Sequence, residues 1–514
     1  MRNWILALAL GLAPASVQAE WFEASSANFV VYADDSERDV RRFSEQLERF
    51  HAAMEIVTGL EGERPSPSNR VTVFMVRNQR QVERLAGNRN IAGFYIPRAG
   101  GSVAFVPRVD AKSGQPDFPM IALLHEYAHH FLISNSRFPS PRWLGEGGAE
   151  FFASAAFTND GGVSIGRPAA HRSWGLLLGR SITAAELVDP TNSEKSARGR
   201  DLDEFYGKSW LLYHYLVFTS ERRGQLQGYL RAMASGKSSL EAAQEVFGDL
   251  DQLERELDRY LRQRTMLSMQ FQPGQLEIAP IALRRLTEGE AAMMPVRIRS
   301  RRGVTREEAV ELLGQARAIA ASYPQDAAVL AALAEAEYDA GNNAEAIAAA
   351  DAALALDPSQ VNAYVQKGYA LFREAPEAED RAAAYRGAIA PFVALNQLEN
   401  DHPLPLVYYF RSFAERGVEP PEQAALGLTR AAELAPFDLH LRLNLASYQI
   451  QKGMLEDARG NLVPLAYNPH GGAMADSARQ VLERIDAGGE TPAAEELIAL
   501  LHAQPADAEA GGAQ

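Results

Sequence analysis

The sequence contains no cysteine among its 514 residues. This absence excludes disulfide bonds, thiolate zinc ligands, cysteine nucleophiles and a lipidated cysteine anchor of the bacterial lipoprotein type. Basic residues are scarce relative to acidic ones, because 51 Lys and Arg stand against 66 Asp and Glu, a formal net charge of -15. A chain with this balance is not expected to bind nucleic acid or anionic lipid through charge alone.

Long apolar runs are nearly absent as well, and the one that stands out extends from Trp4 to Ala13. It follows Arg2 and leads to a small-residue ending before Glu20, a pattern typical of a secretory signal peptide over residues 1–19 with cleavage after Ala19. An uncleaved signal anchor is the alternative, but a bilayer span needs about 20 apolar residues. We therefore expect a periplasmic or secreted bacterial protein with no membrane span after cleavage.

The remaining chain has the composition of folded protein, with 46% hydrophobic and 23% charged residues. Its length allows about three domains. Short apolar runs predict strands over 28–33 and 71–76 and a hairpin over 94–106, and helical spacing predicts a helix over 39–57. These elements predict a small mixed sheet, followed by a mainly helical stretch.

Residues 269–303 are interrupted by prolines and contain two short apolar segments, Leu276–Ile278 and Val296–Ile298. This pattern indicates a connector with short strands. We place the first domain at 20–268 and the connector at 269–303.

After Gly303 the sequence becomes rich in Ala and Leu and repeats itself at a fixed spacing. Pro324 and Pro358 close units 34 positions apart, and Pro436 and Pro469 close units 33 apart. The pattern resembles tetratricopeptide repeats over 304–505, before a disordered tail at 506–514, and a generic helical bundle is the alternative. The resemblance implies a concave surface for a peptide or protein partner.

A metal-binding pattern, His125-Glu126-Tyr127-Ala128-His129, lies on the helix predicted to begin near Pro119. Residues four apart share one helix face, so His125 and His129 can hold one cation, with Glu126 beside them as a general base for a bound water. Zinc would lower the pKa of that water toward about 7. Solvent-exposed or core-packed side chains are the alternative interpretation.

A second pattern, Trp143-Leu144-Gly145-Glu146-Gly147-Gly148-Ala149-Glu150, begins the next predicted helix. Glu146 and Glu150 also share a face, so one can bind zinc and the other can accept a hydrogen bond from a ligand histidine. Two histidines and one glutamate leave one position of a tetrahedral ion open, as hydrolysis requires. We expect one Zn²⁺ per chain.

These two motifs resemble the gluzincin metallopeptidases, in particular the aminopeptidase N type, with HExxH followed by Trp-Leu-x-Glu-Gly. The resemblance implies an α+β zincin-like domain, a small mixed sheet with active-site helices, followed here by the all-α tetratricopeptide solenoid. It implies that His125, His129 and Glu146 are zinc ligands, Glu126 the general base and Glu150 a carboxylate behind the ligands.

Outside these two motifs the resemblance extends to fewer residues. Tyr206-Gly207-Lys208-Ser209 resembles the family's Tyr-x-Lys-Gly segment, which makes Tyr206 the candidate oxyanion donor. A packed aromatic is the alternative role for Tyr206, and His214 is an alternative donor. The family's amine-capturing Gly-x-Met-Glu-Asn segment is missing, so exopeptidase specificity does not follow. The predicted strand 102–106 could still bind an extended substrate by strand addition.

His130 and His171 stay outside this proposed site. The sequence thus predicts a zinc-dependent peptidase whose repeats recruit protein substrates or partners. A tetratricopeptide envelope scaffold with an inactive or structural zinc domain is the competing hypothesis, and a zinc hydrolase of non-peptide substrates is a third. The intact Glu126 favours an enzyme, because a structural zinc site has no use for a general base.

Overall fold

The computed structural model describes residues 20–60, 62–89, 91–109, 114–135, 140–179, 182–189, 202–468, 471–487 and 492–502. The expected signal peptide at 1–19, the tail at 506–514 and the repeat-closing Pro469 lie outside these residues. Within the described ranges no helix has both the length and the apolar character needed to cross a bilayer.

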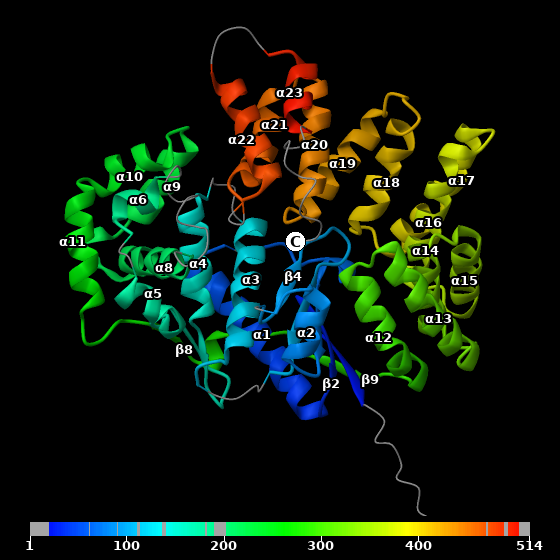
Figure 1. Cartoon of the computed structure of the whole chain (residues 1–514), viewed down its shortest axis with the longest axis horizontal. Coiled ribbons are helices and arrows are strands. Elements are labelled where there is room, and N and C mark those ends of the chain that lie inside the picture. Colours follow the sequence, from blue (N-terminus) through cyan, green and yellow to red (C-terminus); the bar gives the residue numbers. More distant parts are fainter. Residues whose placement is uncertain are drawn as a thin grey trace, which may run out of the picture.

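A six-stranded mixed sheet forms the centre of the N-terminal half, in the order β4-β5-β3-β2-β1-β9 (Figure 1). The pairs β2–β3 and β3–β5 are parallel, and all other pairs are antiparallel. Its strands are β1 (Trp21–Ser25), β2 (Phe29–Asp34), β3 (Val71–Val76), β4 (Phe94–Ile96), β5 (Val103–Pro107) and β9 (Ala282–Arg285). The small mixed sheet was predicted, but β1 and β9 were not.

The hairpin strand at 102–106 was expected to offer a free edge to a substrate, and this expectation is wrong. That segment is β5, which is paired on both sides, with β3 and with β4. Among the described strands, β4 is the one that ends the sheet on this side.

Helices cover both faces of this sheet. One face packs on α1 (Glu37–Thr58) and α3 (Phe118–Asn135), through a core that includes Val31 and Val73. The alternating residues point the other way, as expected for a strand, and Phe74 packs toward α2 (Gln79–Ala86) and α12 (Glu288–Arg302). Residues 288–302, which were expected to belong to a connector, therefore pack on the sheet as part of the hydrophobic core.

The short strands expected within 269–303 are wrong in position. Val296–Ile298 lie inside α12, where Val296 and Ile298 are buried. Pro295 is also within this helix. Because proline usually breaks helices, the sequence did not indicate a helix here. Leu276–Ile278 form no strand, and β8 (Met269–Phe271) and β9 lie on either side of them.

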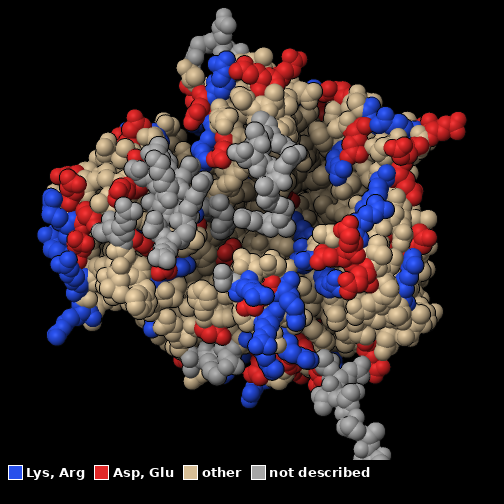
Figure 2. Space-filling model, viewed as in Figure 1, with Lys and Arg blue, Asp and Glu red and all other residues tan. Residues whose placement is uncertain are grey.

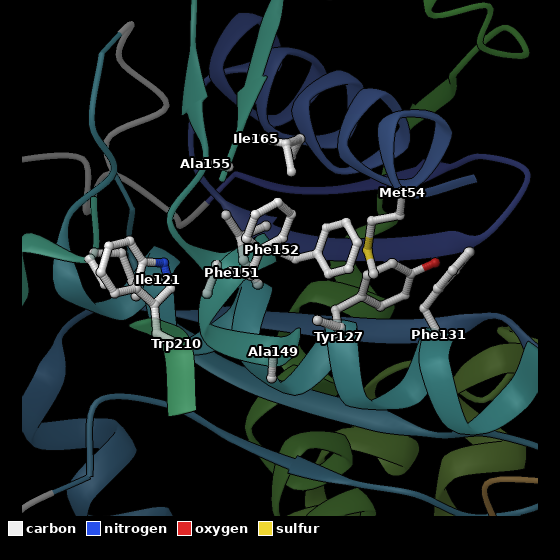
Figure 3. Packing of buried hydrophobic residues seen from close by; sticks show 14 of the residues in the cluster. Met54, Ile121, Tyr127, Phe131, Ala149, Phe151, Phe152, Ala155, Ile165 and Trp210 are labelled. Carbon is white, nitrogen blue, oxygen red and sulfur yellow. The ribbon is translucent and has the colours of Figure 1, made fainter. Parts of the chain in front are cut away.

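A helical lobe follows the sheet along the chain, on the left of Figure 1 and Figure 2. A three-stranded sheet of β6 (Ala156–Phe157), β7 (Val163–Ile165) and β8 accompanies it. The lobe's helices are α4 (Arg142–Ala153), α5 (Ser173–Leu178), α6 (Ala184–Val188), α8 (Leu202–Phe218), α9 (Gln225–Ala234), α10 (Ser239–Phe247) and α11 (Leu250–Leu261). Figure 3 shows side chains of α1, α3 and α4 meeting in one core, among them Met54, Phe131 and Phe152.

The C-terminal half is a repeat-like array of helices that curves around the right side and top of the sheet in Figure 1, in the manner of a tetratricopeptide solenoid. Small residues such as Ala334, Ala350 and Ala363 are buried where its helices approach closely. The helices are α13 (Arg306–Ser322), α14 (Ala327–Asp339), α15 (Asn343–Leu356), α16 (Val361–Glu374), α17 (Arg381–Leu398), α18 (Pro403–Ala414), α19 (Glu422–Leu434), α20 (Leu439–Gln451), α21 (Leu455–Ala466), α22 (Ala473–Asp486) and α23 (Ala494–Leu501).

The repeat region is docked on the sheet domain by several hydrogen bonds. The backbone N–H of Ala99, in the β4–β5 turn, donates to Asp438 Oδ2 over 2.8 Å. Glu399 accepts from both the N–H and the hydroxyl of Ser68, over 2.9 and 2.8 Å. The ring of Phe437 lies 4.4 Å from that of His130 on α3. The turn at 97–102 is thus fixed to the repeat region by contacts within the same polypeptide chain.

Candidate metal centre

The proposed ligands come from two neighbouring helices, α3 and α4. His125 and His129 lie one turn apart on α3, whose other faces are anchored in the core by apolar residues. Glu146 lies on α4, which is buried from Trp143 to Ala153. A close approach of α8 fixes α4 in place, since a Cβ on Gly147 would lie 2.5 Å from the carbonyl oxygen of Ser209.

The three ligand atoms form a nearly equilateral triangle. The two histidine Nε2 atoms are 3.1 Å apart, and Oε2 of Glu146 lies 3.3 Å from that of His125 and 3.4 Å from that of His129. A tetrahedral zinc ion with bonds of about 2.0–2.1 Å separates its ligands by about 3.3 Å. Among the described residues, this is the one group of three or more His, Cys, Asp or Glu side chains whose ligand atoms all lie close enough together to hold one metal ion.

Glu146 also has the environment expected of a metal ligand. Its side chain is fully buried, and neither carboxylate oxygen has a hydrogen-bond partner of acceptable geometry. Such a buried, unsatisfied carboxylate is costly unless a cation compensates it. The donor set of two imidazoles and one carboxylate is the one that zinc takes in hydrolytic sites, so these residues fit a zinc ion.

The histidine and glutamate side chains of this site interact strongly through their charges. Burial alone would lower the pKa of His125, but the Glu146 and Glu150 carboxylates raise it to about 10. Burial would raise the pKa of Glu146, but His125 and His129 hold it well below the usual range of a glutamate. Glu146 therefore remains an anion, and a zinc ion would have to displace the proton that the two carboxylates hold on His125.

Glu150 holds the outer side of His125. Its Oε1 lies 3.3 Å from His125 Nδ1, which leaves Nε2 to face the other ligands. The same carboxylate accepts from His171 Nε2 over 2.6 Å and from Arg172 Nη2 over 2.6 Å. Burial opposes ionisation of Glu150, but the hydrogen bonds from His125 and His171 and the charge of Arg172 keep its pKa well below normal.

His171 and Arg172 belong to the site although the sequence did not predict a role for either of them. Both lie in a short 3-10 turn, Ala170–Arg172, which folds back onto α4. No spacing rule links this turn to Glu150, so the sequence carried no signal that could have identified them.

Tyr206 is brought to the same site by α8. Its ring centroid lies 5.9 Å from that of His125, and the guanidinium of Arg172 lies 4.8 Å from its centroid. Burial and the charge of Glu146 raise the pKa of the phenol above its ordinary value. Tyr206 is therefore protonated at neutral pH and can donate a hydrogen bond.

Glu126 is half-buried on α3, immediately after the first ligand. Its charge acts on Tyr95, at the centre of the edge strand β4, where burial first and then Glu126 raise the pKa of the phenol. The Tyr95 hydroxyl itself lies 2.6 Å from Nδ1 of His130. Strand β4 and the helix that carries Glu126 are therefore in direct contact.

The structure does not bring His214 into the ligand cluster. Its Nδ1 lies 2.8 Å from the Tyr260 hydroxyl, and its Nε2 lies 2.9 and 3.1 Å from the carbonyls of Gly166 and Leu267. Both nitrogens are therefore engaged in the core. His130 stacks on Tyr127 with centroids 5.6 Å apart, so it has a packing contact on the far side of α3.

One cavity of the described structure is separate from the proposed ligands. It has a volume of about 740 Å³ and lies between α1, α3 and the repeat region, with Tyr127, His130 and Phe437 in its wall. None of His125, His129 and Glu146 lines it.

Comparison with known proteins adds little to this geometry. No protein-family model and no curated protein matches the chain. A solved structure of a thermophilic tetratricopeptide protein from Thermus thermophilus is similar over 36% of this chain and 92% of its own, with 18% identity and a TM-score of 0.30. The metallopeptidase resemblance therefore remains a prediction from the two motifs.

Proposed function

We propose that this protein is a secreted or periplasmic zinc-dependent metallopeptidase. The observation that carries the proposal is the triangle of His125, His129 and Glu146, whose edges of 3.1, 3.3 and 3.4 Å fit three ligands of a tetrahedral ion. A zinc ion there would polarise a substrate carbonyl and make a water molecule more acidic.

The chain's own residues have distinct tasks in this proposal. Glu126 takes a proton from the attacking water and passes it to the leaving amine. Tyr206 donates a hydrogen bond to the negative charge that develops on the carbonyl oxygen. Glu150, itself held by His171 and Arg172, orients His125.

Peptide bonds are the preferred substrate because the last strand of the sheet, β4, lies beside the helix that carries two of the proposed ligands. β4 ends the six-stranded sheet, and the hydroxyl of its Tyr95 lies 2.6 Å from Nδ1 of His130 on α3, the helix that carries Glu126. An extended peptide that adds to β4 would place its backbone near the general base. A zinc hydrolase of other substrates would make no use of that edge.

The direct test compares wild type with Glu126→Gln on a library of unstructured peptides. We expect cleavage by wild type, no measurable cleavage by Glu126→Gln, and the same zinc content in both. Glu221→Gln, at an exposed glutamate of the helical lobe, is the matched control and should cleave like wild type. Full activity of Glu126→Gln would refute the proposed role of this residue.

A second candidate function is a repeat scaffold with an inactive zinc domain. The specific observation in its favour is the docking of the β4–β5 turn on the repeats through Ala99 and Asp438, which makes the two halves one unit. A scaffold would bind a protein partner equally well with His129→Ala, which removes a zinc ligand. The enzyme proposal requires the same variant to lose metal and activity.

A further inference from the structure

A cluster of large apolar side chains is exposed on α5, next to the proposed metal centre. Trp174, Leu177 and Leu178 are 72%, 66% and 68% exposed. They are spaced i, i+3 and i+4, so they lie on one face of the helix. We call these three residues the α5 apolar face.

The opposite face of α5 is packed against the start of α8. The N–H of Gly175 donates to Asp203 Oδ2 over 3.1 Å, and a Cβ on Gly175 would lie 2.7 Å from backbone atoms of Asp203 and Glu204. Leu176 packs on Gly207, where a Cβ would lie 2.8 Å from its Cγ. The exposure of the α5 apolar face is therefore fixed by tight packing of the other side.

α5 begins directly after a residue that contacts the candidate metal site. Arg172, which precedes α5, contacts both Glu150 and the ring of Tyr206. Tyr206 in turn lies beside His125. The same turn of chain that supports the proposed ligands therefore presents the three apolar side chains to solvent.

Outside α5, the most exposed large apolar residues of the described chain are Leu267, Val310 and Leu426, and they belong to different segments. Val310 and Leu426, for example, are each 61% exposed but lie on different helices, α13 and α19. Folded monomers rarely expose clustered large apolar groups without a use for them.

We infer that the α5 apolar face binds large apolar side chains of the peptide substrate, and so selects apolar segments of unfolded proteins. This inference rests on the proposed peptidase function, because a peptide bound at the proposed metal centre would extend over the neighbouring surface, which includes α5. Burial of one Trp and two Leu side chains would supply much of the binding energy.

The test measures binding without turnover. In the Glu126→Gln background, a ten-residue peptide with three Leu or Phe residues is titrated against Trp174 fluorescence, beside a matched peptide with Ser and Gln in their place. Trp143 and Trp210 are 1% exposed, so a quencher in solution reports mainly on exposed tryptophans. We expect the apolar peptide to shift the emission to the blue and protect it from the quencher, and Trp174→Phe to abolish the signal but keep the affinity by calorimetry.

The variant Trp174→Ala/Leu177→Ser/Leu178→Ser should bind the apolar peptide at least about tenfold more weakly and leave the polar peptide unaffected. The control Val310→Ser/Leu426→Ser should bind like the parent. Because the three residues are exposed, the thermal midpoint should not fall, which separates lost binding from lost folding.

Three outcomes would overturn the inference. Equal affinity of the triple variant for the apolar peptide would exclude the face as a substrate site. Conversion of a dimer to a monomer by the triple variant, seen by sedimentation, would assign the face to a second copy of the chain. Co-sedimentation of wild type, but not the triple variant, with phosphatidylcholine vesicles would assign it to a lipid surface. Zinc binding and peptide cleavage by wild type would leave the proposed function intact in each case.

Discussion

Nδ1 of His125 lies 3.3 Å from Oε1 of Glu150, a carboxylate outside the triangle of proposed ligands. In the proposed zinc site this contact would leave Nε2 of His125 to face the cation. Glu150 is in turn fixed by His171 and Arg172, and the metal site therefore depends on residues about 20 positions further along the chain.

Glu150→Gln should weaken zinc binding by about 10- to 100-fold, because an amide holds His125 less firmly than a carboxylate. Competition with a chromogenic chelator would measure the change. Asp203→Asn is the control, since Asp203 pairs with Arg172, at 2.9 Å, and so lies one contact further from His125. Unchanged zinc affinity in Glu150→Gln would remove this carboxylate from the metal site.

Tyr206→Phe should lower kcat by about 10²- to 10³-fold with little change in KM, because the lost hydrogen bond forms only in the transition state. Steady-state kinetics on a cleavable peptide would show this. Tyr215→Phe on the same helix removes a hydroxyl that donates to Glu256, and its kcat should match wild type. Equal rates for Tyr206→Phe and wild type would leave Tyr206 as a packed aromatic.

Gly147→Ala should destabilise the fold by about 1–3 kcal/mol, because the new methyl group would overlap the backbone of Ser209 on α8. It should also weaken zinc binding, since Glu146 is the preceding residue. Gly314→Ala is the matched control, because a Cβ there, within α13, would meet nothing within 4 Å. Denaturant unfolding should show Gly314→Ala to be slightly more stable than wild type, by up to about 1 kcal/mol. A stable Gly147→Ala variant would contradict the tight packing of α4 on α8.

Glu399→Ala should loosen the repeat region from the sheet domain. The substitution leaves the N–H and hydroxyl of Ser68 without their acceptor, at a cost of about 1–3 kcal/mol. Hydrogen exchange should rise in peptides that cover residues 66–70. Ser68→Ala, which removes one of the two hydrogen bonds, should show a smaller increase. Identical exchange in all three proteins would mean that this contact does not hold the halves together.

The parts of the fold that could be predicted were those with local signals. The apolar run at 71–76 coincides with β3, and helices α1, α3 and α4 begin within a few residues of their expected starts. The HExxH and Glu146 motifs could be placed on helices, and α3 and α4 do bring those side chains together. The four-residue spacing within each motif was enough to predict that its side chains share one face of a helix.

The remaining features depend on contacts between distant segments. β9 pairs with β1 across some 260 residues, and α12 is stabilised by burial on the sheet although Pro295 argues against a helix. The role of His171 in holding Glu150 depends on how a turn folds back onto α4. No local pattern of residue types encodes such pairings.

The central claim is tested most directly by the zinc content of the mature protein, purified without chelator or affinity metal and measured by elemental mass spectrometry beside Glu146→Ala and the control Glu221→Ala. The account predicts about one zinc per chain in wild type and in Glu221→Ala, and little or none in Glu146→Ala. Absence of zinc from wild type even after reconstitution, or full retention in Glu146→Ala, would contradict it.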